Sequence, residues 1–325
     1  MNTTKFALIT FVVGAAVMAF AHWYKVDYLF FASYTILQFI VLATAWNILG
    51  GYCGYVNFGS AAFFALGAYS TVAVHKLYPL PIPLLMLLGG AVSGLAGLAM
   101  GYLALRLRGA FFAIATLALA VVLQTLVVNW SFVGGARGAY VIRPESVWLI
   151  GSYVHYLFLL MLALAVLAIT TARTIERSRL GFGFATIRDD ELAAEASGVP
   201  TLRLKLVATA VSGAFMGMTG APFPYYIGYV QPASAFGLDY AVNSIAMPMI
   251  GGTTTWIGPL VGAILVASLQ QWASVTFSSE LGLLVVGLLL VGFVIVAPSG
   301  IVGLARKYLP AAARVGRKPK PTDAR

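Results

Sequence analysis

The stretch YLFFASYTILQFIVLATAWNILGGYCGYVNFGSAAFFALGAYSTVAVH, residues 28–75, contains no aspartate, glutamate, lysine or arginine. An α-helix rises about 1.5 Å per residue, so roughly 20 residues cross about 30 Å of membrane hydrocarbon. A charge at the centre of a membrane helix costs about 2.5–3.5 kcal/mol. This stretch is therefore long enough, and apolar enough, to predict two membrane crossings.

The composition of the whole chain supports a membrane protein. Of its 325 residues 61% are apolar and only 9% are charged, whereas a soluble domain carries roughly 25% charged residues. Mean hydropathy is +0.92. These values exclude a soluble globular protein and an intrinsically disordered one. The single cysteine, Cys53, excludes an intrachain disulfide and a cysteine metal cluster.

The spacing of the charge-free stretches predicts about ten transmembrane helices in an all-α polytopic membrane protein. Long unbroken apolar runs favour helices over the short alternating segments of a membrane barrel. The predicted helices cover residues 6–22, 28–49, 58–75, 81–104, 109–130, 152–172, 205–225, 238–251, 258–276 and 281–300. The first has an alternative reading as a cleavable signal peptide ending near Ala19-Phe20-Ala21, but its length favours a retained helix.

The distribution of basic residues predicts the orientation. If both termini lie on one side, 16 of the 20 lysines and arginines lie there and 4 lie opposite. The positive-inside rule places that side in the cytoplasm. We expect a transmembrane domain over 1–305 and a basic tail over 306–325, the tail near anionic lipid headgroups. A nucleic-acid partner would require a basic folded domain, and the sequence does not predict one.

The segment 173–205 is the one substantial cytoplasmic loop that this topology predicts. Within it, residues 188–198 predict a short amphipathic helix, with acidic residues at its start and Gly198 at its end. Leu192, Ala196 and Val199 would form its narrow apolar face. Such a helix either docks on a partner protein or is simply solvated.

The same loop resembles the EAA-type coupling loop of ABC importer permeases at Glu191, Ala193, Ala194, Glu195 and Gly198. Further blocks resemble the branched-chain amino-acid permeases of the LivM type. In chain order they are GYCGYVNFGSAAFFALGAY (51–69), LRLRGAFFAIATLA (105–118), SRLG (178–181), IRDDELAAEASG (187–198), GGTTTWIGPLVG (251–262) and PSGIVG (298–303).

This resemblance implies a type II-like ABC importer permease bundle in a bacterial plasma (inner) membrane. It implies a second permease subunit, two cytoplasmic ABC ATPases and an extracytoplasmic solute-binding protein as partners. The predicted ATPase-coupling residues are Asp190, Glu191, Ala193, Ala194, Glu195 and Gly198. The solute would be a branched-chain amino acid, or else urea, an amide or another small organic acid.

The residues themselves predict a transport subunit rather than an enzyme. The chain has no phosphate-binding loop of the Walker type, so ATP hydrolysis would belong to partner subunits. No cluster of His, Asp, Glu or Cys has catalytic or ligand spacing, so we expect no cofactor, metal or catalytic residue. An autonomous channel or facilitator for a small neutral solute remains the alternative function.

The predicted helices carry no aspartate or glutamate away from their ends, whereas proton-coupled carriers typically have intramembrane carboxylates. A solute path would then use neutral polar groups and the backbone of interrupted helices. Two glycine-broken elements fit, 50–59 and 248–262. The candidate path residues are Asn47, Asn57, Ser60, Gln124, Asn243 and Thr254. Each could equally serve only in helix packing.

Overall fold

The computed structural model describes residues 27–104, 106–142, 146–147, 151–276, 279–296 and 300–308, with four isolated residues at positions 6, 8, 12 and 14. The predicted first helix, its signal-peptide alternative and nearly all of the predicted tail lie outside these residues. The proposed domain boundaries therefore remain predictions.

Helices account for most of the described chain. The long ones are α2 (Asp27–Asn47), α3 (Ser60–Leu77), α4 (Ile82–Ala104), α5 (Ala110–Val128), α6 (Tyr153–Glu176), α9 (Thr201–Gly220), α12 (Leu238–Gly251), α13 (Ile257–Thr276) and α14 (Ser279–Val296). The short ones are π-helix η1 (Ile48–Tyr52), 3-10 helices η2 (Ser131–Val133) and η3 (Gly135–Arg137), α7 (Arg179–Asp189), α8 (Glu191–Ala196), α10 (Phe223–Ile227), α11 (Pro232–Ala235) and α15 (Gly300–Tyr308).

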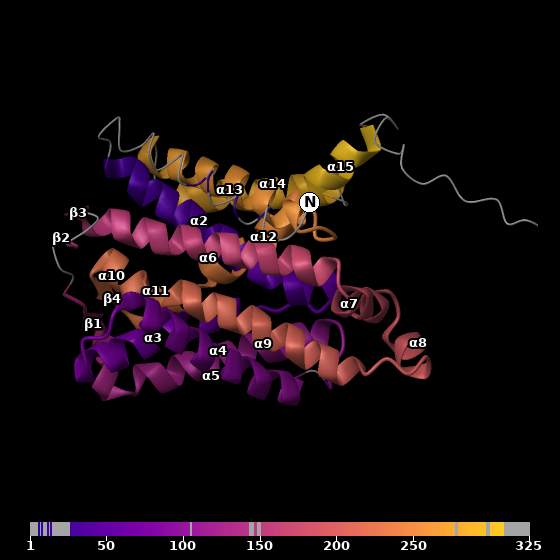
Figure 1. Ribbon diagram of the computed structural model, residues 1–325, viewed down its shortest axis with the longest axis horizontal. Helices are drawn as coiled ribbons and strands as arrows, with labels where there is room; N and C mark the ends of the chain where they lie inside the picture. The colour runs from indigo at the N-terminus through magenta and orange to yellow at the C-terminus, as the bar shows by residue number, and fades with distance from the viewer. Residues whose placement is uncertain are drawn as a thin grey trace, which may run out of the picture.

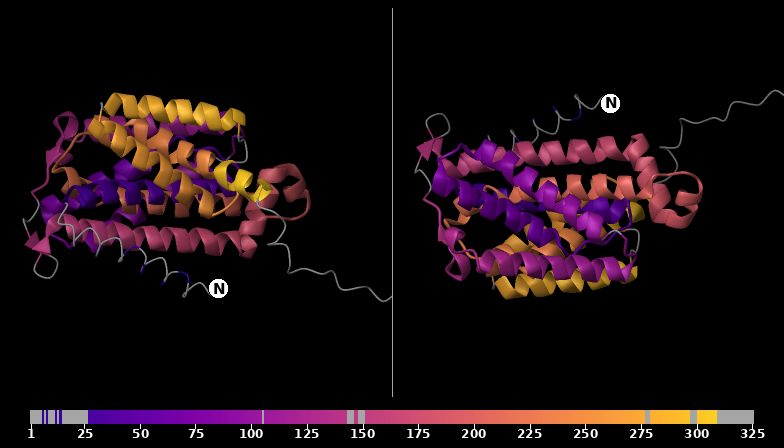
Figure 2. Two further views of the ribbon diagram at one scale, coloured as in Figure 1. Left: turned by 90° about the horizontal axis from the view of Figure 1, so that it is seen from above. Right: turned by 90° about the horizontal axis from the view of Figure 1, so that it is seen from below.

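The long helices run roughly along one axis of an elongated bundle (Figures 1 and 2). α7 and α8 project at one end, and four two-residue strands lie at the other. We call these the α7–α8 end and the β end. The strands β1 (Ala139–Tyr140) and β4 (Tyr229–Val230) pair antiparallel, as do β2 (Ser146–Val147) and β3 (Gly151–Ser152). They are a small addition to the predicted all-α fold.

Among the described residues, five helical segments are long and apolar enough to cross a membrane. They are Tyr28–Tyr52, Ile82–Ala104, Ala110–Val128, Tyr153–Glu176 and Thr201–Ile227. Each overlaps a predicted crossing, which confirms a helical, multi-pass membrane protein. The predicted segments at 58–75, 238–251, 258–276 and 281–300 are helical too, as α3, α12, α13 and α14. Ten crossings remain a prediction.

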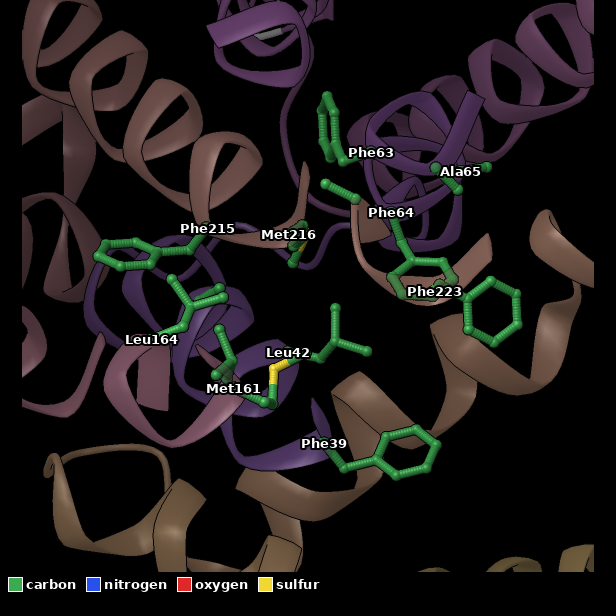
Figure 3. Close-up of a cluster of buried hydrophobic side chains, with 14 of the residues drawn as sticks. Phe39, Leu42, Phe63, Phe64, Ala65, Met161, Leu164, Phe215, Met216 and Phe223 are labelled. Carbon is green, nitrogen blue, oxygen red and sulfur yellow. The ribbon is translucent and has the colours of Figure 1, made fainter. Parts of the chain in front are cut away.

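The main core forms around α2, which packs against α6, α9, α12 and α13. Its buried aromatic and aliphatic side chains come from helices far apart in the sequence (Figure 3). Those labelled there are Phe39, Leu42, Phe63, Phe64, Ala65, Met161, Leu164, Phe215, Met216 and Phe223. This core places the first broken element, after α2, beside the second, after α12.

Glycines allow α3, α4 and α9 to pack closely. A Cβ at Gly67 of α3 would lie 2.0 Å from the carbonyl oxygen of Gly217 in α9, and one at Gly217 would lie 2.4 Å from the Gly89 oxygen in α4. Backbones approach this closely only where no side chain intervenes. These contacts therefore set the distances between the three helices.

Candidate functional site

Two short helices replace the single helix predicted over 188–198. α7 ends at Asp189 and α8 begins at Glu191, because Asp190 between them has extended backbone angles (φ −159°, ψ 108°). The Asp190 carboxylate accepts hydrogen bonds of 2.9 and 3.1 Å from N–H groups in the first turn of α8. The prediction of one continuous helix over 188–198 is wrong, because Asp190 interrupts the helix and serves as the N-cap of α8.

The predicted apolar face of this segment is wrong as well. Leu192 is 63% exposed and Ala196 is also exposed. The buried residue of α8 is Ala194, which shares a cluster with Phe184, and Val199 packs against that cluster. The break at Asp190 turns α8 so that a different residue faces the bundle.

We call α7 and α8 together the α7–α8 unit, and α7 attaches it to the rest of the bundle. Its N-cap, Ser178, accepts a hydrogen bond from the N–H of Leu180 (3.2 Å). Phe184 and Ile187 are buried where α7 packs against η1 and α9. Phe182 points away from this contact and is 70% exposed. α7 therefore has one face in the bundle and one apolar face uncovered.

A buried ion pair joins α8 to α9. Lys205 Nζ donates to Glu191 Oε1 at 2.7 Å, and the two side chains are only 4% and 12% exposed. The Tyr55 hydroxyl donates to Glu191 Oε2 and accepts from Lys205 Nζ at 3.1 Å. Charge-assisted hydrogen bonds are the stronger kind. The three groups therefore hold the start of α8 on the bundle.

These neighbours determine the ionisation of Glu191. Burial raises the pKa of its carboxyl, but hydrogen bonds from Lys205 and Tyr55 lower it, as do the charges of Lys205 and Arg108. The result is a pKa below the usual value, so the carboxylate stays ionised at neutral pH.

The remaining predicted coupling residues lie around this pair. Glu195 accepts from the Thr201 hydroxyl (2.7 Å) and lies 3.8 Å from the half-exposed guanidinium of Arg108. Ala193 is exposed, and so is Gly198, whose φ of +81° favours glycine. The structure thus brings the six predicted residues into one unit, with Glu191 and Ala194 inward and the others outward.

Two predicted path residues lie at the first residue of α3 and shortly before it. Ser60 is 1% exposed, and its hydroxyl is 2.7 Å from that of Ser244 in α12. Asn57 is equally buried; its carbonyl oxygen accepts from Trp46 Nε1 (2.8 Å), and its Oδ1 accepts from the N–H of Gly59 (2.7 Å). The Ser60–Ser244 contact joins the residue directly after the first predicted broken element to α12, just before the second.

The other four predicted path residues are more scattered. Asn243 is buried and accepts from Gln270 (3.0 Å). Asn47 is buried beside Gly51, while Thr254 is exposed on the turn after α12. Gln124 lines a cavity of about 270 Å³ that is bounded by α5, by the α11–α12 region and by Phe58 and Ala61. The six residues therefore do not form one continuous lining.

Sequence reasoning missed three residues at the α7–α8 end. Tyr55 and Lys205 complete the Glu191 cluster, and Glu176 accepts a hydrogen bond from the N–H of Trp256 (2.7 Å), which fixes the turn after α12. Lys205 lies at the edge of a predicted crossing. The sequence analysis counts it among the basic residues that determine orientation and not as a partner of Glu191.

Comparison with known proteins relates this fold to a transport family. The family described as "Branched-chain amino acid transport system / permease component" matches residues 27–294. The high-affinity branched-chain amino acid transport system permease protein LivM of Salmonella typhimurium is 28% identical over 83% of this chain and 69% of its own length. LivM of Escherichia coli is 27% identical over the same shares.

A third relative is more distant. The autoinducer 2 import system permease protein LsrC of an Enterobacter species is 25% identical over 61% of this chain and 57% of its own length. No solved structure matches. The family match covers most of the described helices, from the start of α2 into α14. The chain belongs to the permease-component family of branched-chain amino acid transport systems.

Proposed function

We propose that this chain is the membrane-spanning subunit of an ATP-driven ABC importer. Its solute would be a branched-chain amino acid, as the names of the two LivM relatives suggest. The LsrC relative carries the name of a different solute, so urea, an amide or another small polar solute is the alternative.

The observation that carries this proposal is the α7–α8 unit. It is anchored from within by a buried ion pair, yet it exposes Phe182 (70%), Leu192 (63%) and Leu180 (39%) at the end of the bundle. Exposed apolar residues on an anchored element suit a protein partner. We assign an ABC ATPase to this face, in the cytoplasm, where the positive-inside rule puts this loop.

The complete importer would contain two such ATPases, a second permease and a solute-binding protein at the β end, in a bacterial inner membrane with both termini of this chain in the cytoplasm. The solute path would run along the junction of the two broken elements. Asn57, Ser60 and Asn243 are buried there, so this structure corresponds to a closed path. Asn47 and Thr254 would lie toward its cytoplasmic end, and Gln124 off the main path.

A docking experiment tests this assignment. Leu192→Asp and Phe182→Asp place a charge on the proposed ATPase face without touching the buried pair. The matched control is Ile142→Asp, because Ile142 is 85% exposed at the β end. We expect the ATPases to co-purify with the wild type and the control, but not with the two face variants. Retained association would refute the docking face, and specific flux through the chain alone would support the facilitator alternative.

A further inference from the structure

We propose that Tyr55 is a positioning residue through which movement of α8 reaches the solute path. This inference rests on the proposed importer function and adds the route by which the ATPase acts on the membrane helices. The route is the segment 53–59 between η1 and α3, which we call the linker segment.

One side of the linker segment is attached to the α7–α8 unit. Tyr55 shares both partners of the buried pair: its hydroxyl bonds to Glu191 and Lys205, and its ring lies 4.8 Å from Lys205 Nζ. Arg188, near the end of α7, adds a contact to η1 just before the segment, since its Nη1 donates to the carbonyl oxygen of Gly51 at 3.4 Å. A displacement of α8 would therefore also displace Tyr55.

The other side of the linker segment is attached to three membrane helices. The oxygen of Asn57 accepts from Trp46 of α2, as described, and the N–H of Phe58 donates to Thr116 of α5 at 3.1 Å. Two residues later, Ser60 meets Ser244 of α12. The segment thus connects α8 to the buried polar groups proposed for the path.

The linker segment also has space to move. A cavity of about 360 Å³ lies beside it, bounded by residues 53–56, by the start of α5 and by Arg188 and Glu191. Atoms that face a void lack the contacts that hold a packed interior in place. Gly54 has a φ of +81°, and a π-helix, a form frequent at functional sites, precedes the segment. The segment is therefore held on its packed side, by the named hydrogen bonds, by the bond from the Tyr55 N–H to the Leu49 carbonyl oxygen (3.1 Å) and by the burial of Cys53 and Tyr55, and it has free space on its cavity side.

The test measures coupling in the complete importer rather than the presence of a fold. Tyr55→Phe keeps the ring, which packs edge-on against Phe112 at 5.0 Å, and removes only the hydroxyl. The matched control is Tyr102→Phe on α4, because Tyr102 is 57% exposed. In proteoliposomes we expect the amount of solute transported per ATP hydrolysed to fall about tenfold in Tyr55→Phe, as for the loss of one hydrogen bond to a charged group. The control should keep the wild-type ratio.

Hydrogen exchange supplies a second readout. In the wild-type complex, ATP should change the exchange of residues 52–59, and in Tyr55→Phe that change should disappear. A wild-type transport ratio, or an ATP response that persists in the variant, would overturn the inference. If Leu192→Asp abolishes ATPase binding while Tyr55→Phe transports normally, only this route fails. If Leu192→Asp binds the ATPases normally, the proposed docking face fails, and if the chain alone carries specific flux, the importer assignment itself fails.

Discussion

Glu191 is held by groups that lie far from it in the sequence. Lys205 binds it from α9 and Tyr55 from the linker segment. Sequence patterning singled out Glu191 because it ends the acidic run Asp189-Asp190-Glu191 and is one of the residues that resemble an EAA-type coupling loop. It could not identify Tyr55, because nothing local in the sequence indicates a contact between residues 136 positions apart.

Removing either Lys205 or Glu191 alone should lower the free energy of unfolding more than removing both. Lys205→Met leaves the buried Glu191 carboxylate with only the half-exposed Arg108, whose Nε lies 3.6 Å away, as a cation; breaking a fully buried pair costs about 3–5 kcal/mol, which is the upper bound for this loss. The double variant Lys205→Met, Glu191→Leu removes both charges and should recover at least half of that loss. Unfolding in a graded series of detergent mixtures measures both. Equal destabilisation by the single and double variants would show that the pair is not coupled.

The lowered pKa of Glu191 predicts how α8 responds to pH. Because the folded-state pKa lies below the unfolded value of about 4.3, the pair contributes stability above that value and loses it as pH falls through the folded-state pKa. A spin label at Ala193→Cys reports this, because Ala193 is exposed and the native Cys53 is buried. Its mobility should stay low from pH 8 to pH 5 and rise only below about pH 4.3.

Lys205→Met is the matched control for that titration. It removes the first of the groups that lower the pKa of Glu191, while burial continues to raise it. The rise in mobility should therefore move to higher pH. An unchanged midpoint in this variant would contradict the account of Glu191.

At the scale of elements, the long apolar helices were predictable and the short helices α7 and α8 were not. α4 spans 82–104 where 81–104 was predicted, because hydropathy alone defines such a helix. α7 was missed because Gly181 and Gly183 weaken its helical pattern. Tertiary burial of Phe184 and Ile187 stabilises it instead.

The glycine contacts among α3, α4 and α9 yield a prediction about packing. Gly67→Val places side-chain atoms where the carbonyl oxygen of Gly217 lies, so the helices must separate, at a cost of about 3 kcal/mol. Gly292→Val is the control, because a Cβ at that position of α14 meets no atom within 4 Å. Thermal unfolding in detergent should show a lower midpoint for Gly67→Val alone. Equal midpoints would refute close packing at this site.

At the scale of the whole molecule, composition predicted a multi-pass helical membrane protein and the family match supports a transport subunit rather than an enzyme. The residues of the solute path remain predictions. Ser60 contacts Ser244, the neighbour of Asn243, whereas Gln124 lines a cavity on the α5 side of Phe58 and Ala61. Polar residue types inside apolar helices do not reveal which side of a helix faces the path, because that depends on how the helices pack.

The central claim is that a partner ATPase, acting through the α7–α8 unit, drives solute across this bundle. Uptake by proteoliposomes that hold the complete importer, with the binding protein outside and ATP sealed inside, tests it most directly. We predict that branched-chain amino acid accumulates above its external concentration only when ATP is present, and that Leu192→Asp abolishes this accumulation. Equal accumulation without ATP, or with Leu192→Asp, would contradict the claim.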